Sequence, residues 1–269
     1  MTGKMGTAVV TGASSGIGAV YADRLAGRGY DLILVARNEE RLKAVAAKVR
    51  DNHGVQVRVV IADLAFGADL VKVEDILRSD GTITALVNNA GVGGASPLLE
   101  TDVEEMQDMI AINVTAPMRL TYAVTPAMVA RGSGTIVNIA SIVAIGPEIL
   151  NGVYGGTKSF ILGFSQSLRH ELAGKGVAVQ VVLPGATATD FWDVAGVGIG
   201  NLPSAWLMSA ADLVDCALSD LDSGEFASVP SLQDIDEWNA YEAARQVMVP
   251  HLSSNTPGPR YTKKPAPVH

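Results

Sequence analysis

Short apolar runs alternate with longer segments of helical periodicity along most of the chain. Most of the short runs are apolar throughout, which is typical of parallel strands that helices cover on both faces. Strands that alternate with helices indicate βαβ units. The sequence therefore predicts the α/β class, with one doubly wound parallel sheet of about seven strands in the order 3-2-1-4-5-6-7. The predicted strands are Thr7–Thr11, Asp31–Ala36, Val55–Ile61, Ala85–Asn88, Thr135–Ala140, Val177–Leu183 and Phe226–Val229.

The segments between the strands carry the helical pattern. The stretch from Phe160 to Leu172 keeps an apolar face at helical spacing and ends at a Gly-Lys-Gly stop signal. Pro117 falls inside the longest helical stretch, and because proline removes a backbone hydrogen bond we expect it to kink or split that helix. The predicted helices are Ile17–Gly27, Glu39–Asn52, Ala68–Ser79, Val103–Arg131, Gly155–Ala173 and Ala210–Leu221.

Two segments depart from this alternation. Gly185–Met208 is long for a connection and rich in glycine and alanine, so we interpret it as a lid loop, with an ordinary surface excursion as the alternative. The last 40 residues contain one helical stretch, Ile235–Val249, and a proline-rich end that we expect to be extended. We therefore predict a dinucleotide-binding catalytic domain over residues 1–229, with residues 230–269 as a helix and tail of the same domain.

Composition and charge narrow the classes of partner. The 269 residues carry 28 Asp and Glu against 20 Lys and Arg, a formal charge of −8, which argues against nucleic acid or an anionic membrane as a partner. The apolar runs are far shorter than the ~20 residues that span a bilayer, and no charged segment precedes a long apolar one at the N-terminus. We therefore expect a soluble, cytoplasmic protein.

The lone cysteine and the four histidines give no sign of a metal site. Cys216 cannot form an internal disulfide, and its apolar neighbours predict that it is a small buried side chain. The histidines have no second histidine or carboxylate at ligand spacing, so we predict surface residues and no metal.

A glycine-rich turn joins the first strand to the first helix. It reads Thr-Gly-Ala-Ser-Ser-Gly-Ile-Gly over residues 11–18. In a Rossmann-type sheet, such a turn lets backbone N–H groups and a helix N-terminus hold a pyrophosphate. Gly12 would permit the tight turn, Gly16 the approach of a cofactor, and Gly18 the packing of helix on strand. Taken alone the turn is a weak signal, because tight turns need glycine for steric reasons.

Tyr154 and Lys158 form a second candidate site. Four positions apart, they share one face of a predicted helix. An adjacent ammonium favours the phenolate form of tyrosine, so the pair could transfer a proton; a solvated pair on a helix is the alternative. Ser141 follows the fifth strand, where its hydroxyl could hold a substrate oxygen in the crevice at the carboxyl ends of the strands.

Seven motifs in sequence order make residues 5–221 resemble the short-chain dehydrogenase/reductase family. Each follows or adjoins the end of a predicted strand, where the site of an open α/β sheet lies. The motifs are the turn at Thr11–Gly18, Asp63-Leu64, Asn88-Asn89-Ala90-Gly91, Asn113, Ser141, Tyr154 with Lys158, and Pro184-Gly185.

The resemblance implies a role for each residue. Tyr154 would be the general acid/base, Lys158 would lower its pKa and hold the ribose of the nicotinamide, Ser141 would orient the substrate oxygen, and Asn113 would support a water chain. The remaining implied contacts are to the cofactor: Gly12, Ser14, Ser15, Gly16, Ile17 and Gly18 in the turn, Asp63 and Leu64 at the adenine, Asn89, Ala90 and Gly91 at its ribose, and Pro184, Gly185, Thr187 and Thr189 at the nicotinamide. Thr187 departs from the family pattern, which often has valine there.

The end of the second strand predicts NADP(H) over NAD(H). A site selective for NAD(H) places a carboxylate about 20 residues past the glycine turn, but this chain has Ala36 there, followed by Arg37. The Arg37 guanidinium could pair with a 2′-phosphate, and Ser14 and Ser15 could add hydroxyl donors. The alternative is that Arg37 is a surface residue of an enzyme that accepts NAD(H).

We expect an NADP(H)-dependent oxidoreductase acting on a carbonyl/alcohol pair. Residues 176–244 contain no lysine or arginine, and the lid carries Phe191, Trp192 and Trp206, so we expect a neutral, partly apolar ketone or aldehyde. The alternatives are a non-catalytic NADP(H)-binding sensor on the same fold and an epimerase or dehydratase. The resemblance also implies a homodimer or homotetramer, and the apolar circumference around Phe160 and Phe164 suits burial on two sides.

Overall fold

A seven-stranded, wholly parallel sheet organises the first of the two compact units into which the chain divides, Met1–Ser231 and Leu232–His269. The computed structural model describes residues 5–262. The strand order, β3-β2-β1-β4-β5-β6-β9, confirms the predicted doubly wound topology. The strands are β1 (Thr7–Thr11), β2 (Asp31–Ala36), β3 (Val57–Ile61), β4 (Ile83–Asn88), β5 (Gly134–Ile139), β6 (Val177–Val182) and β9 (Ala227–Ser228).

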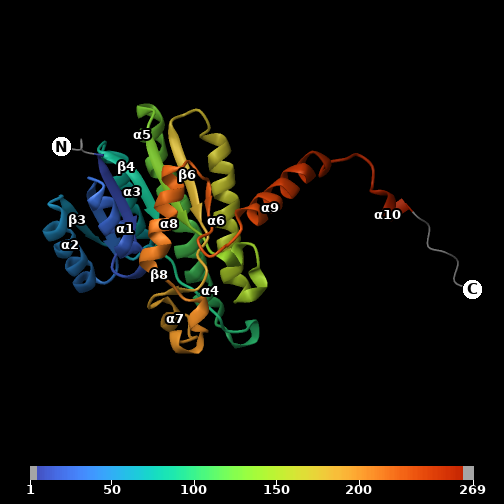
Figure 1. The fold of residues 1–269 in the computed structure, drawn as a ribbon, viewed down its shortest axis with the longest axis horizontal. Coiled ribbons are helices and arrows are strands. Elements are labelled where there is room, and N and C mark those ends of the chain that lie inside the picture. Colours follow the sequence, from blue (N-terminus) through green and yellow to red (C-terminus); the bar gives the residue numbers. More distant parts are fainter. Residues whose placement is uncertain (1–4, 263–269) are drawn as a thin grey trace, which may run out of the picture. The chain divides into compact units, whose positions relative to one another are not determined.

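Helices cover both faces of the sheet, as the continuous apolar strands require (Figure 1). The helices α1, α2 and α8 pack together on one face, and α3, α5 and α6 lie on the other. The helices of this unit are α1 (Gly16–Gly27), α2 (Glu39–His53), α3 (Gly67–Ser79), α4 (Val103–Ile110), α5 (Ala116–Arg131), α6 (Gly152–Glu171), α7 (Phe191–Val194) and α8 (Ala210–Asp222).

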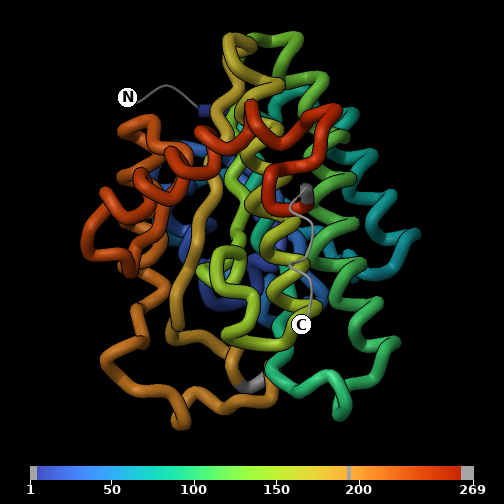
Figure 2. Tube along the Cα trace, turned by 90° about the vertical axis from the view of Figure 1, so that its right-hand side faces the viewer, coloured from blue at the N-terminus to red at the C-terminus, as the bar shows by residue number. Residues whose placement is uncertain are grey.

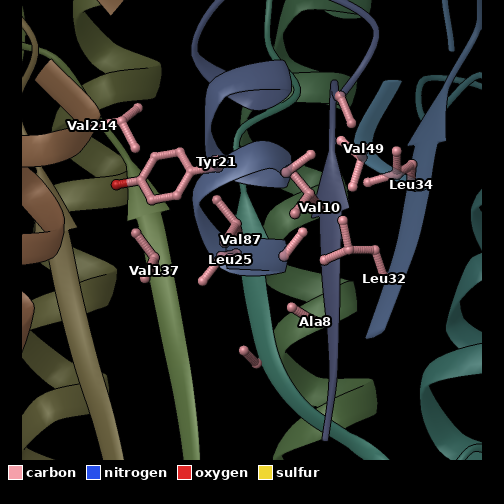
Figure 3. Packing of buried hydrophobic residues seen from close by; sticks show 14 of the residues in the cluster. Ala8, Val10, Tyr21, Leu25, Leu32, Leu34, Val49, Val87, Val137 and Val214 are labelled. Atoms are coloured by element: carbon pink, nitrogen blue, oxygen red, sulfur yellow. The ribbon is translucent and has the colours of Figure 1, made fainter. Parts of the chain in front are cut away.

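The core under α1 and α8 is built almost entirely of aliphatic side chains. Figure 3 shows the Tyr21 ring reaching from α1 toward Val214 of α8 and Val137 of β5. Tyr21 is fully buried, and its hydroxyl has no hydrogen-bond partner. Burial accordingly raises its pKa strongly. The ring therefore acts as an apolar filler between the sheet and two helices.

A chain of buried amides connects β4 and β5 to α6 on the other face. Asn88 and Asn138 lie side by side in the register of β4 and β5, and Asn88 donates to Asn138 at 2.9 Å. Asn138 donates in turn to the Ser165 hydroxyl at 2.9 Å. Because buried polar groups are costly unless paired, this series of hydrogen bonds fixes α6 on the sheet, just below the carboxyl ends of the two strands.

The predicted long helix over 103–131 is split, as Pro117 led us to expect. Its two parts, α4 and α5, are joined by the π turn η2 (Ala111–Thr115), in which the Ala116 N–H donates to the Ala111 carbonyl. Pro117 has no N–H to give to the carbonyl of Asn113 four residues earlier, so the regular ladder breaks there. The break places Asn113 within the π turn.

The lid segment after β6 has more structure than a loop. It contains a short parallel pair, β7 (Thr187–Ala188) with β8 (Met208–Ser209), the helix α7, and the single turns η5 (Ile199–Asn201) and η6 (Ser204–Trp206). Figure 2 shows this segment (orange) at the same edge of the sheet as the chain that follows β4 (teal). Both segments therefore lie where the carboxyl ends of the strands meet.

The second unit contains the predicted helix and little else. Its helix α9 (Ile235–Met248) continues into the turn η7 (Val249–His251), and α10 (Pro259–Thr262) follows. Trp238 and Tyr241 lie one turn apart on α9, with ring centroids separated by 5.6 Å. Pro265, Pro267 and His269 of the proline-rich end lie outside the described residues. That residues 230–269 belong to the catalytic domain stays a prediction.

One expectation about α8 needs correction. Cys216 is exposed, not buried, because the buried face of α8 is formed by Leu213, Val214, Ala217 and Leu218. The stretch without lysine or arginine is also less anionic than its sequence suggests. Three of its carboxylates form ion pairs with arginines from other elements: Asp190 with Arg41, Asp215 with Arg24, and Asp222 with Arg28.

Among the described residues, no helix is long and apolar enough to cross a membrane. Within the same residues, no group of three or more His, Cys, Asp or Glu side chains is arranged to hold a metal ion.

Candidate functional site

The glycine turn after β1 folds as the sequence predicts. Gly12 and Gly16 have φ angles of +66° and +53°, which side chains rarely adopt. A Cβ on Gly18 would collide with the carbonyl of Gly12, so the helix α1 packs directly on the turn. Ile17 packs against the core cluster, and Ser14 and Ser15 are half-buried beside it.

The N-terminus of α1 is suited to an anion. Its N-cap, Ser15, makes no side-chain cap hydrogen bond, and no acidic residue lies in its first turn. The capped helices α2, α4 and α8 each have an acidic residue there, whereas the capped helix α6 has none. Because the first N–H groups of a helix have no partner within it, and the dipole favours negative charge, these residues fit the pyrophosphate of a dinucleotide.

Asn89 and Thr11 hold the turn in place. The Asn89 amide donates to the carbonyls of Thr11 and Gly12 at 2.8 and 3.2 Å, and the Thr11 hydroxyl accepts from the N–H groups of Asn89 and Ala90, both at 3.0 Å. The Asn89 side chain is therefore committed to the β1 turn. These bonds use the amide nitrogen of Asn89, so a contact with a cofactor ribose falls to its amide oxygen or its backbone.

Asn113 joins three segments at the same edge. Its amide exchanges hydrogen bonds with the backbone of Val92, at 2.9 and 2.8 Å, and donates to the Thr157 hydroxyl of α6 at 3.1 Å. A Cβ on Gly91 would lie 3.0 Å from the Asn113 amide oxygen and 3.6 Å from the Lys158 ammonium. The Asn-Asn-Ala-Gly motif, the π turn and α6 therefore converge on one point.

Tyr154, Lys158 and Ser141 lie together beneath the lid. Tyr154 and Lys158 are only 5% and 7% exposed, and the Lys158 Nζ lies 5.8 Å from the centroid of the Tyr154 ring and donates to the carbonyl of Ile139 at 3.0 Å. Ser141 follows β5, and its hydroxyl donates to the carbonyl of Pro184 at 3.4 Å. The sequence alternative of a solvated tyrosine–lysine pair is thus wrong.

The electrostatics of this trio are dominated by burial. Burial raises the pKa of Tyr154 to about 12, an effect that a hydrogen bond with Ser141 partly offsets. Burial also lowers the pKa of Lys158 to about 8. Both groups are therefore held nearer their neutral forms than they would be in water. The lowering of the Tyr154 pKa by Lys158, which the resemblance implies, remains a prediction.

The segment after β6 closes the site from the other side. Thr189 faces the glycine turn, where a Cβ on Gly16 would lie 3.1 Å from its methyl group. Thr187, the departure from the family pattern, is buried, and its hydroxyl donates to the carbonyl of Gly185 at 3.1 Å. The hydroxyl thus has the partner that burial demands.

Arg37 and Asp63 face each other beyond the ends of β2 and β3. The Arg37 guanidinium lies 3.6 Å from the Asp63 carboxylate, and the two side chains are 62% and 39% accessible, so the pair is weak. Leu64 is buried beside them. Ala36 ends β2 and carries no acceptor. An accessible guanidinium next to an apolar strand end is compatible with a 2′-phosphate.

Three contributors were missed from the sequence. Asn151 caps α6, accepting from the N–H groups of Val153 and Tyr154, so the helix begins at Gly152 and not at Gly155; an asparagine before a helix is a recognisable N-cap signal. Thr157, whose hydroxyl accepts a hydrogen bond from the Asn113 amide, is not part of any sequence motif named above. Phe191 was assigned only to the lid, yet its ring packs on that of Tyr154, with centroids 5.8 Å apart.

Comparison with known proteins agrees with this arrangement. Residues 6–196 match the family model for short chain dehydrogenases. A short-chain dehydrogenase from Sphingobium yanoikuyae, solved in complex with NADPH, is 44% identical over 96% of this chain and 100% of its own, with a TM-score of 0.92. The bulky-bulky ketone specific alcohol dehydrogenase from Comamonas testosteroni is 38% identical over 97% of this chain and 100% of its own, with a TM-score of 0.89.

A human relative is longer than this chain, and its name describes it as inactive. The inactive hydroxysteroid dehydrogenase-like protein 1 from Homo sapiens is 36% identical over 185 residues, which cover 68% of this chain and 56% of that protein. The chain thus spans little more than half the length of this relative.

The buried ammonium predicts an unusual dependence of stability on pH. Because the pKa of Lys158 is lower in the folded protein than the ordinary 10.5, the unfolded chain binds more protons between about pH 8 and 10.5, and stability rises with pH there. Lys158→Met removes this dependence. As pH rises from 8 to 10.5, the free energy of unfolding of wild type should therefore increase by on the order of 3 kcal/mol more than that of Lys158→Met.

Urea unfolding across that pH range makes the measurement. Lys43→Met, which replaces an exposed lysine paired with Glu39, is the matched control. Parallel curves of stability against pH for wild type and Lys158→Met would contradict the burial of a charged group at this position.

Proposed function

The chain belongs to the short-chain dehydrogenase family, and we propose on that basis that it transfers a hydride between NADP(H) and a carbonyl/alcohol pair. The observation that carries the proposal is the convergence of Asn113, Ser141, Tyr154 and Lys158 beneath one lid, from three separate parts of the fold: the π turn η2, the end of β5 and the helix α6. A bound nicotinamide cofactor supplies the hydride. The chain's own residues must then orient a carbonyl and deliver a proton to its oxygen.

Each of the four residues is suited to a part of that task. The Tyr154 hydroxyl, kept protonated at neutral pH by its high pKa, donates the proton to the substrate oxygen during reduction and takes it back during oxidation. The Ser141 hydroxyl, which lies close enough to Tyr154 to lower its pKa, aligns the same oxygen. Lys158 stabilises the phenolate that is left behind, because an adjacent cation favours the charged form. Asn113 fixes Thr157 and hence α6 in place.

The cofactor preference rests on the glycine turn and Arg37. The uncapped N-terminus of α1 is the pyrophosphate site, and Arg37, together with Ser14 and Ser15, holds the 2′-phosphate. The complex of the Sphingobium relative with NADPH supports this choice. NAD(H) remains the weaker ligand in this proposal.

The proposed substrate is a neutral, bulky and partly apolar ketone or aldehyde. The segments that follow β4, β5 and β6 expose apolar side chains near the strand ends: Leu98 and Leu99 of η1 (Leu98–Glu100) are 82% and 96% exposed, and Ile149 and Trp206 are exposed as well. Exposed apolar side chains on segments around a site favour an apolar ligand. The specificity of the Comamonas relative for bulky-bulky ketones supports the same class.

A non-catalytic NADP(H) sensor remains the second candidate. The observation in its favour is the human relative, whose name describes it as inactive. Against it stand the four residues of the proton-transfer site, all present and all brought together in this chain.

We expect Tyr154→Phe to lower kcat for a ketone by at least ~100-fold, since a positioned acid/base typically contributes about 10²–10⁴, while the affinity for NADPH changes little. Tyr21→Phe is the matched control because the Tyr21 hydroxyl has no partner, and its kcat should equal that of wild type. Steady-state oxidation of NADPH across ketones, with fluorescence titration of NADPH, makes the comparison. Equal turnover by wild type and Tyr154→Phe would reject Tyr154 as the acid.

Arg37→Ala should weaken NADPH binding about 10- to 100-fold and leave NADH binding nearly unchanged, because a charge-assisted hydrogen bond contributes roughly 1.5–3 kcal/mol. Arg58→Ala, on the exposed side of β3, controls for the loss of a surface arginine. Titration of both cofactors measures the preference. A wild type that prefers NADH, or an unchanged NADPH affinity in Arg37→Ala, would overturn the assignment.

We also propose a homodimer or homotetramer, joined through the outer faces of α5 and α6. Tyr122, 68% exposed, stacks on Phe164, which stacks on Phe160, and so large an aromatic surface is costly to leave in water. Sedimentation at micromolar concentration should show an oligomer for wild type and a smaller species for Tyr122→Glu. Tyr261→Glu, at another exposed tyrosine, is the control, and a monomeric wild type would contradict the proposal.

A further inference from the structure

The ring of Phe191 lies against the proposed acid and against bare backbone. Its centroid is 5.8 Å from that of Tyr154, and it belongs to the small apolar cluster around Tyr154, Met109 and Val143. A Cβ on Gly93 would overlap the same ring. Only glycine at position 93 leaves room for the ring as it lies.

Neighbouring contacts hold the Phe191 ring in place. Trp192 is buried, its indole N–H donates to the carbonyl of Thr187 at 2.9 Å, and its ring meets that of Phe191 edge-on at 5.3 Å. On the other side of Phe191, Asp190 forms an ion pair with Arg41 of α2 at 2.8 Å. Both sequence neighbours of Phe191 are therefore anchored, Trp192 to β7 and Asp190 to α2.

This position has a consequence for any substrate that reaches Tyr154. A carbonyl group within hydrogen-bond reach of the Tyr154 hydroxyl carries two substituents, and a group on the side of Phe191 must fit beside the ring or displace it. Interiors are close-packed, so displacement of the ring costs contacts with Tyr154 and Trp192. The size of that substituent is thus limited by one side chain.

We propose that Phe191 is a specificity-determining residue, whose ring, seated on Gly93, limits the size of the substituent admitted beside Tyr154. The inference rests on the proposed function, because it concerns a ketone or alcohol bound at that site. It adds which residue sets the limit and why position 93 must remain glycine.

The test compares wild type, Phe191→Ala, Gly93→Ala and the double variant with a small and a bulky ketone, cyclohexanone and benzophenone. Hydrophobic pockets discriminate by about 10- to 200-fold per added methylene. We expect Phe191→Ala to raise the ratio of kcat/KM for benzophenone over cyclohexanone by at least ~10-fold. Phe66→Ala, at an exposed phenylalanine, should leave the ratio within twofold of wild type.

The two positions should also be coupled. A Cβ at position 93 displaces the Phe191 ring, so Gly93→Ala should change the ratio several-fold in wild type and much less in Phe191→Ala, where the ring is absent. An equal effect of Gly93→Ala in both backgrounds overturns the inference, as does a ratio in Phe191→Ala within twofold of wild type. Phe191→Leu should give an intermediate ratio if Phe191→Ala does not fold.

A binding measurement separates this inference from the proposed function. Calorimetry of cyclohexanol and diphenylmethanol, titrated into protein saturated with NADP⁺, gives an affinity ratio that needs no turnover. Absent turnover with a shifted affinity ratio would reject the proposed reaction and keep the role of Phe191. Turnover by wild type, with the same affinity and kcat/KM ratios in wild type and Phe191→Ala, would keep the proposed reaction and reject the role of Phe191. A wild type that neither turns over nor binds these compounds would reject both.

Discussion

Every feature of the candidate site depends on the parallel direction of seven strands. Because they all run the same way, their carboxyl ends meet at one edge, and the segments that leave them must share that space. Residues far apart in sequence therefore meet there: Thr11 at the end of β1 is hydrogen-bonded to Asn89 after β4, and Ser141 after β5 to Pro184 after β6. The site therefore follows from the direction of the strands.

Two local devices then place the reacting groups at that edge. Pro117 breaks the ladder of the long helix, and the resulting π turn places Asn113 against Val92 and Thr157. Asn151 starts α6 early enough that Tyr154 and Lys158 both lie inside regular helix, one turn apart. Burial beneath the lid then sets their pKa values in opposite directions, which keeps Tyr154 protonated as a proton donor should be.

The sequence predicts the strands, their order and the glycine turn because these depend on local pattern and on glycine's backbone freedom. It locates Asn113, Ser141, Tyr154 and Lys158 through motifs, but it cannot reveal contacts between distant segments. The packing of Phe191 on Gly93, and the pairing of Asp190 with Arg41, required the tertiary structure. Cys216 was misjudged because its neighbours in sequence are apolar while its own face of α8 points outward.

The central claim is that this arrangement transfers a hydride and does not merely bind a dinucleotide. A single-turnover reaction with NADPH deuterated at C4 of the nicotinamide, and a bulky aromatic ketone in excess, tests that claim most directly. The account predicts an alcohol that carries deuterium on the former carbonyl carbon. The deuterium should be transferred from only one of the two C4 positions, so only one of the two stereospecifically labelled cofactors should give labelled alcohol. Tight binding of NADPH with no deuterated alcohol, across a panel of ketones and aldehydes, would contradict it.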